Sequence, residues 1–428
     1  SPIYRLPPEV TGQSFQEKLT ALQQKMASCK TDVIILTALE EIAWLFNMRG
    51  SDIEHTPVFY SFVAITRTDY TLFAPPKDML PEDFPKNKVC RYSAINEYLS
   101  NIDSDMRVWL CKSQGSYWML KHLCKTSKLN FNQTPIALMK AIKNNVEIKA
   151  TKNAHLKDGI AVTTFIHWVK NNIGKVPMSE LSASDFLKNC RKKQAGYKEP
   201  SFTTISGYNS NGAIIHYTPT ISSNATLESK GFLLVDSGGQ YSDGTTDITR
   251  TIALGPLTPK MKEYYTAVLK AHIALASAEF SEGTTGADLD AVTRKPLTDL
   301  GLNYNHGTGH GVGHMLSVHE GPQNISPRGN SQQMLPGMIT SNEPGVYIPG
   351  EFGIRLENEI LCVKKNNGKL AFETLTLCPF DLDAIITDQL THAEKEWLNS
   401  YHENIVSKLS PYLDKKVASW LKATIRKI

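Results

Sequence analysis

The stretch FLLVDSGGQYSDGTTDITRTIAL, residues 232–254, places two carboxylates where buried strands are expected. An apolar run ends at Asp236, a turn follows at Ser242–Gly244, and Asp247 lies in a returning run rich in Thr and Ile. β-Branched residues on both sides of a glycine-bearing turn predict a β-hairpin. A carboxylate in a buried strand costs free energy unless a positive group meets it. The stretch therefore indicates that both aspartates face something positive.

The composition is that of an ordinary soluble protein with two domains. The 428 residues exceed what a single hydrophobic core usually serves. Apolar residues make up 41% and charged residues 21% of the chain, and the formal net charge is only +4. No basic run interleaved with aromatic residues marks a nucleic-acid surface, so we expect no nucleic-acid partner.

The cysteines and the apolar runs indicate a cytoplasmic location. The seven cysteines are widely spaced and include no CxxC pair, which favours a reducing compartment over a disulfide framework or a zinc knuckle. No apolar run approaches the roughly 20 residues that span a bilayer. The first residues, SPIYRLPPEV, lack the basic flank and apolar core of a signal peptide. We therefore expect a cytoplasmic protein without a membrane partner.

Residues 1–136 are predicted to form a small α/β domain. Helical spacing over Ser14–Ser28 precedes a short buried strand at Asp32–Ala38, and a second helix is expected over Leu39–Gly50. Residues Ser61–Pro76 have the pattern of a β-hairpin. Because strands alternate with helices, we expect a mixed sheet covered by helices.

The second domain is predicted over residues 137–428, with the boundary at about Ile136. A long helical stretch at Asn144–Asn171 opens it, and a second helix at Ser182–Lys193 has a serine N-cap signal at its first residue. Strands and helices then alternate. The tail Thr391–Ile428 predicts two amphipathic helices that pack on the domain or on a partner subunit.

Four later stretches also place ionisable residues in or beside expected strands. NGAIIHY puts His216 after an apolar strand, MITSNEPGVY puts Glu343 after a strand-like start, and FGIRLENEILCV carries Glu357 among alternating apolar residues. The stretch YNHGTGHGVGHMLSVHEGP holds four histidines, which are His306, His310, His314 and His319.

Each of these residues also has an ordinary structural interpretation. An isolated buried carboxylate is most often tied to an arginine, and Arg250 and Arg355 are available. A lone histidine beside an apolar run, such as His216, is more often a hydrogen-bonded core residue, and His314 is expected to be structural or exposed. Two arginines are nevertheless too few for the four carboxylates, which are Asp236, Asp247, Glu343 and Glu357. Taken jointly, the pattern favours a functional site.

A site for two divalent cations balances these charges. Four negative charges match two dications, and a hairpin brings Asp236 and Asp247 to one face of the sheet. With Glu343, Glu357 and the imidazole of His310, the donors are mostly hard oxygens, which suit Mn²⁺ or Co²⁺ and also accept Zn²⁺. Two such ions roughly 3.5–4 Å apart make hydroxide from water at neutral pH. The sequence therefore predicts a hydrolytic site.

A zincin helix is the rival metal motif, and the sequence argues against it. His306 and His310 have the i, i+4 spacing of that helix, but they lie in HGTGHGVG, whose glycines disfavour a helix. Gly307 rather than Glu follows the first histidine. No lysine follows the glycine-rich stretches in the manner of a phosphate-binding loop. The glycines instead predict close approach of the backbone to a ligand.

Together these motifs resemble those of aminopeptidase P, the X-prolyl aminopeptidase of the pita-bread metallopeptidases, and most closely its eukaryotic cytosolic type. The resemblance rests on NGAIIHY, DSGGQYSDGTTDITRT, HGTGHGVG, VHEGP, NEPG and GIRLENE in that order, and on Thr37–Phe59 in the first domain. It implies an α+β protein with a C-terminal pita-bread (creatinase/aminopeptidase-like) catalytic domain. A smaller creatinase-N-like α/β domain would precede it. Long members carry a further N-terminal domain, so we expect a short form or a truncated chain.

The resemblance also implies the metal ligands and the reaction. The ligands of a dinuclear site, usually manganese, would be Asp236, Asp247, His310, Glu343 and Glu357. A hydroxide that bridges the two cations would attack the carbonyl before a proline, and Glu343 would also accept a proton. The substrates would be peptides with proline in second position. The enzyme would be a homodimer.

Four further residues would contact the substrate in this family. His306 and His319 would hydrogen-bond the tetrahedral intermediate and the peptide backbone. His216 would line the site near the scissile bond, and Arg355 would orient the peptide. Because the X-Pro amide has no N–H, recognition must rest on the ring shape and the carbonyl group.

Three other functions compete with this one. A prolidase, which cleaves only X-Pro dipeptides, uses the same five ligands, so the metal site does not separate the two activities. A creatinase-like relative without metal, or a catalytically dead binding module of the histone-chaperone type, should have lost ligands that are all present here. The eukaryotic-type motifs favour aminopeptidase P.

Overall fold

The computed structural model describes residues 2–76, 79–123, 128–329 and 331–428. The chain forms two compact units, Ser1–Glu147 and Ile148–Ile428. The first unit thus continues past the boundary expected at Ile136. The reason is that helix α6 (Pro135–Ala141) buries its apolar side chains against α2 and α3 of that unit.

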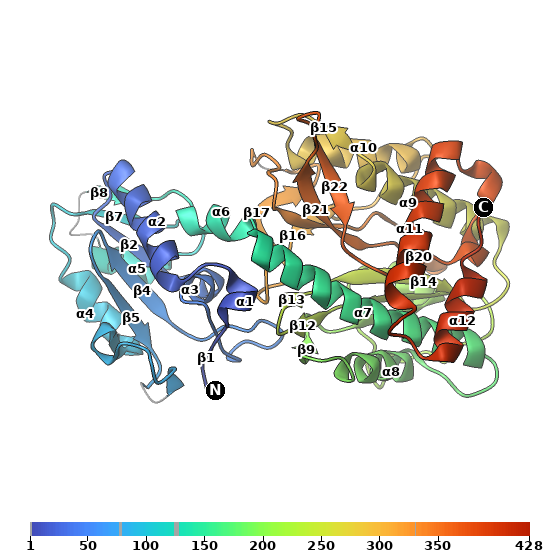
Figure 1. Cartoon of the computed structure of the whole chain (residues 1–428), viewed down its shortest axis with the longest axis horizontal. Coiled ribbons are helices and arrows are strands. Elements are labelled where there is room, and N and C mark those ends of the chain that lie inside the picture. The colour runs from blue at the N-terminus through green and yellow to red at the C-terminus, as the bar shows by residue number, and fades with distance from the viewer. Residues whose placement is uncertain (1, 77–78, 124–127, 330) are drawn as a thin grey trace. The chain divides into compact units, whose positions relative to one another are not determined.

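A six-stranded mixed sheet forms the centre of the first unit, with helices packed around it (Figure 1). The pair β4 and β5 is antiparallel and confirms the expected hairpin, while β2 and β7 run parallel. In sheet order the strands are β6 (Val89–Arg91), β5 (Tyr70–Ala74), β4 (Phe62–Thr66), β2 (Val33–Leu36), β7 (Arg107–Leu110) and β8 (Lys128–Asn130). The helices are α1 (Pro8–Thr11), α2 (Phe15–Ser28), α3 (Leu39–Leu45), α4 (Ile95–Ser100) and α5 (Tyr117–Leu123).

The first two expected helices of this unit differ in how well they were predicted. Helix α2 begins where expected, because Ser14 caps the N–H of Glu17 and the Glu17 carboxylate accepts the Ser14 N–H at 2.7 Å. Helix α3 ends at Leu45, earlier than predicted. A short strand, β3 (Met48–Arg49), follows and pairs with β1 (Tyr4–Arg5).

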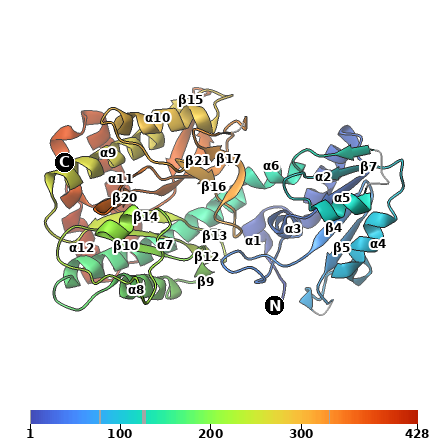
Figure 2. The same ribbon diagram turned by 180° about the vertical axis from the view of Figure 1, so that it is seen from behind.

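In the second unit, strands lie between two helical layers. Figures 1 and 2 both show α9 and α10 on one side of the strands and α7 and α8 on the other. The bounds of these helices are α7 (Asn145–Asn172), α8 (Glu180–Lys192), α9 (Pro259–Ala276) and α10 (Gly286–Thr298). Helix α8 starts earlier than predicted, because Ser179 rather than Ser182 is its N-cap and the two serines bond each other reciprocally.

The strands of the second unit form one six-stranded sheet and smaller sheets. The large sheet has the order β15 (Glu279–Phe280), β22 (Leu370–Thr374), β21 (Asn358–Lys364), β18 (Ile339–Asn342), β16 (Gly309–Gly311) and β17 (Glu320–Ile325). One three-stranded sheet has the order β10 (Ile205–Tyr208), β11 (Phe232–Ser237) and β14 (Ile248–Ala253). Another has the order β13 (Gly244–Thr245), β12 (Gly239–Tyr241) and β9 (Tyr197–Pro200). A two-stranded sheet pairs β19 (Gly345–Ile348) with β20 (Phe352–Arg355).

The expected hairpin of residues 232–254 is present but interrupted. Strands β11 and β14 pair antiparallel, with Asp236 opposite Thr249. Between them, β12 and β13 form a separate small hairpin that pairs with β9. Asp247 consequently lies just before β14 and not inside it. The chain crosses itself closely here, since a Cβ atom at Gly238 would lie 1.9 Å from the carbonyl oxygen of Thr246.

The C-terminal tail forms the two predicted helices, α11 (His392–Leu409) and α12 (Lys415–Thr424). They bury Leu398, Ile405 and Leu421 in the same hydrophobic core as α9. The tail is therefore part of the packing of the second unit. Among the described residues, no helix has the length and apolar character needed to cross a bilayer.

Candidate active site

A cavity of about 340 Å³ in the second unit is lined by all of the residues that were predicted as metal ligands or substrate contacts. Phe202, Ile205 and Ile215 add an apolar wall. The predicted residues that line it are His216, Asp236, Asp247, His306, His310, His319, Glu343, Arg355 and Glu357.

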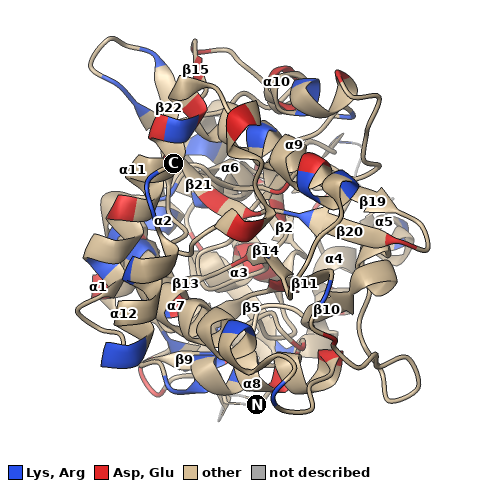
Figure 3. Ribbon diagram, turned by 90° about the vertical axis from the view of Figure 1, so that its right-hand side faces the viewer, with Lys and Arg blue, Asp and Glu red and all other residues tan. Residues whose placement is uncertain are grey.

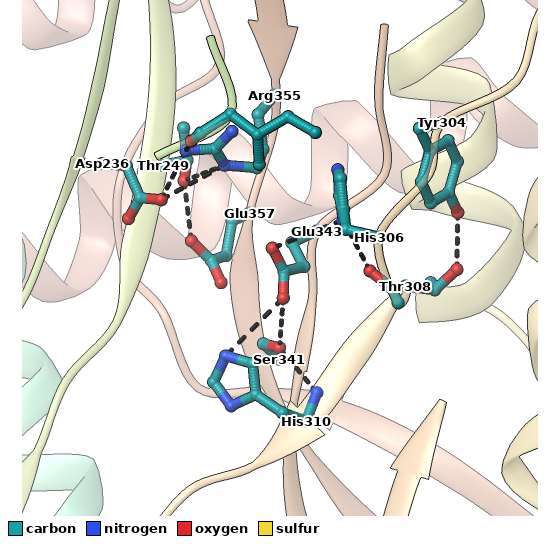
Figure 4. Close-up of polar contacts among 12 residues, drawn as sticks. Asp236, Thr249, Tyr304, His306, Thr308, His310, Ser341, Glu343, Arg355 and Glu357 are labelled. Atoms are coloured by element: carbon teal, nitrogen blue, oxygen red, sulfur yellow. Dashed lines mark hydrogen bonds and ion pairs between the residues drawn. The ribbon is translucent and has the colours of Figure 1, made fainter. Parts of the chain in front are cut away.

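The four carboxylates reach the cavity from the ends of strands. Asp236 lies on β11, and Asp247 comes directly before β14. Glu343 follows the last residue of β18, and Glu357 lies between β20 and β21. Acidic ribbon segments lie beside the labels of β14 and β21 in the middle of the molecule (Figure 3). Figure 4 shows the carboxylates of Glu343 and Glu357 between the Asp236–Arg355 pair and His310.

Burial and mutual repulsion dominate the electrostatics of these carboxylates. Burial raises the pKa values of Asp247 and Glu357 well above their ordinary ranges, and the neighbouring carboxylates raise them further. Burial also raises the pKa of Glu343 to about 7. Such a group of side chains remains ionised at neutral pH only if cations offset the repulsion.

The donor atoms fit divalent cations. Among the described residues, Oδ1 of Asp236 and Oδ1 of Asp247 are buried without a hydrogen-bond partner. Three sets of donor atoms each lie within 4.8 Å of one another. These sets are Asp236, Asp247 and Glu357; His310, Glu343 and Glu357; and Asp247, His310 and His319. Hard oxygen donors with one or two imidazoles are the ligand type of a dinuclear metal site.

Ser341 orients two of the candidate ligands. Its hydroxyl accepts the backbone N–H of His310 at 3.0 Å and donates to Oε1 of Glu343 at 3.3 Å. The Nε2 atom of His310 then lies 3.6 Å from Glu343 and 3.4 Å from Asp247. The His310 Nδ1 atom is 3.0 Å from the carbonyl oxygen of Gly311, which identifies Nε2 as the nitrogen free for a cation.

Arg355 corrects the charge balance inferred from the sequence. Its Nη2 atom donates to Asp236 at 2.6 Å, so one of the four negative charges does have an arginine partner. Its Nη1 atom donates to the Tyr347 hydroxyl at 2.7 Å. Because these partners occupy much of the guanidinium, Arg355 contacts the cavity as a paired residue and not as a free cation.

A chain of hydrogen bonds links Arg355 to His306. The Tyr347 hydroxyl accepts from Arg355 and lies 2.8 Å from Nε2 of His306, and Nδ1 of His306 is 2.7 Å from the Gly307 carbonyl oxygen. Burial and, to a smaller extent, the positive charge of Arg355 lower the pKa of His306 to about 4. His306 is therefore neutral near pH 7, with Nδ1 as donor and Nε2 as acceptor.

The other histidines occupy three different environments. His319 packs edge-on against His310 with ring centroids 4.2 Å apart, and burial lowers the pKa of His319 to about 4. His216 is exposed at the cavity. The strand predicted before His216 is absent, because residues Asn209–Ala213 form a 3₁₀ turn instead. His314 is buried, 3.1 Å from the Thr151 hydroxyl, in a structural role.

The sequence reasoning missed two residues that contact the predicted ones. Tyr347 joins Arg355 to His306, and Thr249 donates from Oγ1 to Glu357 at 2.7 Å. Thr249 lies opposite Asp236 in the β11–β14 pair, so the expected hairpin contained the signal for it. For Tyr347, four residues after Glu343, the sequence held no comparable signal.

The fold and the cavity together define a metal-dependent hydrolase of the pita-bread class. The sequence pattern of metallopeptidase family M24 matches residues 149–364, and that of its C-terminal region matches residues 368–428. The creatinase/prolidase N-terminal domain matches residues 1–147. The chain belongs to metallopeptidase family M24, and the fold expected from the resemblance is confirmed.

Relatives of known name agree with this assignment. The chain is 39% identical to Xaa-Pro aminopeptidase 1 of Dictyostelium discoideum, over 99% of this chain and 70% of that protein. It is 38% identical to Xaa-Pro aminopeptidase ApepP of Drosophila melanogaster, over 98% of this chain and 72% of that protein. The predicted resemblance to aminopeptidase P is thus confirmed.

Solved structures agree with it as well. The X-prolyl aminopeptidase from Caenorhabditis elegans, described as a cytosolic enzyme with a di-nuclear active site, superposes with a TM-score of 0.95 at 31% identity. This superposition covers all of the present chain and 73% of that one. The Xaa-Pro dipeptidase from Bacillus anthracis superposes with a TM-score of 0.69 at 24% identity, over 87% of this chain and 100% of that one, and shows the common fold alone.

Proposed function

We propose that the chain is a metal-dependent Xaa-Pro aminopeptidase, which removes the N-terminal residue from peptides with proline in second position. The observation that carries the proposal is a single cavity with four carboxylates and His310, in which two buried carboxylate oxygens have no partner among the described residues. Relatives named Xaa-Pro aminopeptidase, aligned over nearly the whole chain, support the substrate class.

In this proposal two divalent cations are held by the predicted ligands, which are Asp236, Asp247, His310, Glu343 and Glu357. Mn²⁺ suits this set of mostly carboxylate donors, and Co²⁺ or Zn²⁺ would also bind. When bound, such a pair of cations polarises a carbonyl group and lowers the pKa of water enough to supply hydroxide at neutral pH.

Glu343 is the proton acceptor in this reaction. Its carboxylate lies 3.6 Å from Nε2 of His310 and 3.9 Å from Nδ1 of His306. It therefore lies between His310, a proposed metal ligand, and His306, which would contact the substrate. The hydrogen bond from Ser341 keeps one carboxylate oxygen in a fixed orientation.

The neutral histidines bind the peptide. His319 would donate to the substrate carbonyl as negative charge develops on its oxygen, and His216 would line the cavity near the scissile bond. His306, whose N–H already bonds to Gly307, would accept a hydrogen bond from the substrate through Nε2 in place of Tyr347. Arg355 would act on the peptide mainly through its partners Asp236 and Tyr347. The X-Pro amide offers no N–H, so the apolar wall of Phe202, Ile205 and Ile215 would recognise the proline ring by shape.

Assembly as a homodimer in the cytoplasm completes the proposal. The related enzyme of Caenorhabditis elegans is described as cytosolic. The six cysteines in the described part of the chain are free, which suits a reducing compartment. Light scattering of the purified chain tests the dimer, and a monomer at micromolar concentration would contradict it.

A comparison of three peptides tests the activity. With Mn²⁺ present, Gly-Pro-Ala should be cleaved between glycine and proline, whereas Gly-Ala-Ala should not be cleaved. Gly-Pro should be a poor substrate. Cleavage of Gly-Pro alone would identify a prolidase instead, and cleavage of none of the three would refute the proposal.

A further inference from the structure

Arg250 on β14 is a buried arginine without an acidic partner. The residue is 3% exposed, and no carboxylate in the described part of the chain lies within ion-pair distance of its guanidinium. Burial of a charge that no opposite charge meets is unfavourable. The cavity does not include Arg250 among its lining residues. The burial of Arg250 against the backbone of Glu357 therefore requires another explanation.

One edge of the Arg250 guanidinium binds the backbone of Glu357, which is a predicted metal ligand. Nη1 of Arg250 donates to the carbonyl oxygen of Glu357 at 2.6 Å and to that of Thr249 at 2.9 Å. The Glu357 N–H donates to the Thr249 carbonyl oxygen at 3.1 Å, and the Thr249 hydroxyl donates to the Glu357 carboxylate at 2.7 Å. Two neighbours on β14 thus hold both the backbone and the side chain of Glu357.

The other edge of the guanidinium reaches the C-terminal helix α11. Nη2 of Arg250 donates to Oδ1 of Asn358 at 2.8 Å and to the Tyr401 hydroxyl at 3.1 Å. The Tyr401 hydroxyl also lies 2.9 Å from the carbonyl oxygen of Cys378 and 3.0 Å from that of Thr376, to one of which it donates. Tyr401 therefore links the tail to the residue after Glu357.

Helix α9 holds the same segment through His272. Nδ1 of His272 lies 3.2 Å from the Leu356 carbonyl oxygen, and the Asn358 amide donates to Nε2 of His272 at 3.1 Å. The residues before and after Glu357 are thus fixed by α9, and Glu357 itself by β14. A segment held at three consecutive residues has little freedom to turn its central carboxylate away from a cation.

We propose that Arg250 is a positioning residue for Glu357 and that Tyr401 completes it, so that the C-terminal tail sets the affinity of the active site for divalent cations. The proposal rests on the proposed function, in which Glu357 is a metal ligand. Arginine suits this place because its planar fork donates to several neutral acceptors at once, which lysine does not.

From the sequence, the tail Thr391–Ile428 is expected only to pack on the domain or on a partner subunit. The hydroxyl of Tyr401 gives it a second task, because this one oxygen contacts the guanidinium that holds Glu357. Removal of a group that orients a metal ligand typically weakens metal binding or activity by about 10- to 100-fold. The effect should appear as weaker metal binding before it appears as a loss of folding.

Titration of the metal-free full-length chain with Mn²⁺ tests this proposal. Tyr401→Phe removes only the hydroxyl, and Arg250→Lys keeps the charge but loses the fork. Each should raise the dissociation constant for Mn²⁺ by about 10- to 100-fold, while kcat at saturating Mn²⁺ should return towards the wild-type value. Tyr412→Phe, at a residue that is 63% exposed, is the matched control and should bind Mn²⁺ as the wild type does.

Two results would overturn the proposal, and they differ from each other. Wild-type affinity for Mn²⁺ in Tyr401→Phe, even with a lower unfolding temperature, would show that the hydroxyl serves packing alone. Tyr401→Phe decides the matter if Arg250→Lys does not fold. Failure of the wild type itself to take up Mn²⁺ would instead refute the proposed function. Glu357→Gln, which should lose Mn²⁺ binding, separates these two outcomes.

Discussion

Both units bury carboxylates, but among the described residues only the second unit leaves buried carboxylate oxygens without a hydrogen-bond partner. In the first unit, Glu41 is 1% exposed, and its carboxylate accepts hydrogen bonds from Thr134 at 2.6 Å and Gln114 at 3.3 Å. Glu147 of the same unit accepts the Asn144 N–H at 3.0 Å, and although burial raises its pKa, the charge of Lys18 opposes that rise. Each of these buried acids is satisfied by its own chain, so neither requires a ligand.

The second unit also has buried acids with full partners, such as Asp158 with Arg191, but at the cavity it gathers four carboxylates that the chain satisfies only in part. Arg355 meets Asp236 through one oxygen, and Thr249 meets Glu357. The other oxygen of Asp236 and one oxygen of Asp247 have no partner among the described residues. Burial of a single carboxylate therefore does not identify a functional site, whereas several buried carboxylates with unsatisfied oxygens mark a site for cations.

A matched pair of alanine variants tests this difference most strongly. Asp247→Ala should lower kcat by about 1000-fold or more, since it removes a predicted metal ligand. The bound Mn²⁺ per chain, measured by mass spectrometry, should fall below that of the wild type. Glu41→Ala, the control in the first unit, should retain kcat and metal content in the folded fraction. Full activity of Asp247→Ala would show that the ligand assignment is wrong.

His306→Ala should separate catalysis from metal binding. The variant should lose about 100-fold in kcat, because it removes a hydrogen-bond partner that helps to position the substrate. Its Mn²⁺ content should stay near that of the wild type, since both ring nitrogens of His306 bond to Tyr347 and Gly307. Equal losses of metal and turnover would identify His306 as a ligand instead.

The sequence indicated the residues that line this cavity because their types are chemically unusual for strands. Asp236 and Glu343 are conspicuous after apolar runs, and a pair of strands around a turn brings Asp236 near Asp247. Regular periodicity likewise predicted α2, α7 and the two C-terminal helices within a few residues. These features depend on local pattern, which a single sequence displays.

Contacts between distant segments could not be read in the same way. The pairing of Arg355 with Asp236 joins residues far apart in the chain, and no local pattern distinguishes Arg355 from Arg250, which binds neutral acceptors. The strand expected before His216 failed because apolar residues in NGAIIHY resemble a strand although the chain turns there. Tertiary packing overrides short-range preference in such cases.

Glu41→Ala should reveal what the first unit gains from its satisfied carboxylate. The variant leaves the buried Thr134 hydroxyl without its acceptor, so the free energy of unfolding should fall by about 1–3 kcal/mol. Differential scanning calorimetry should show a lower unfolding temperature. Unchanged stability would mean that Thr134 finds another partner, such as water, and would weaken the contrast between the units.

His402 of α11 should give the smallest effect, and it extends the comparison to a buried base in the second unit. Its Nε2 atom accepts the backbone N–H of Phe380 at 3.1 Å, which requires an unprotonated nitrogen. Burial and, to a smaller extent, the positive charge of Arg250 lower the pKa of His402 to about 3. The surrounding chain thus keeps His402 neutral and hydrogen-bonded, just as hydrogen bonds within the first unit satisfy its buried acids.

The sign of the resulting pH dependence follows from the two states. An unfolded histidine binds a proton below about pH 6.5, whereas folded His402 binds one only near pH 3. The contribution of neutral His402 to the free energy of unfolding is therefore complete above pH 6.5 and is lost as the pH falls towards 3. The loss is at most about 1.4 kcal/mol per pH unit. His402→Gln keeps an acceptor for Phe380 but does not titrate, so its unfolding temperature should fall less steeply between pH 6.5 and 5. Parallel curves for the two proteins would show that His402 is protonated in the folded state, which the hydrogen bond from Phe380 forbids.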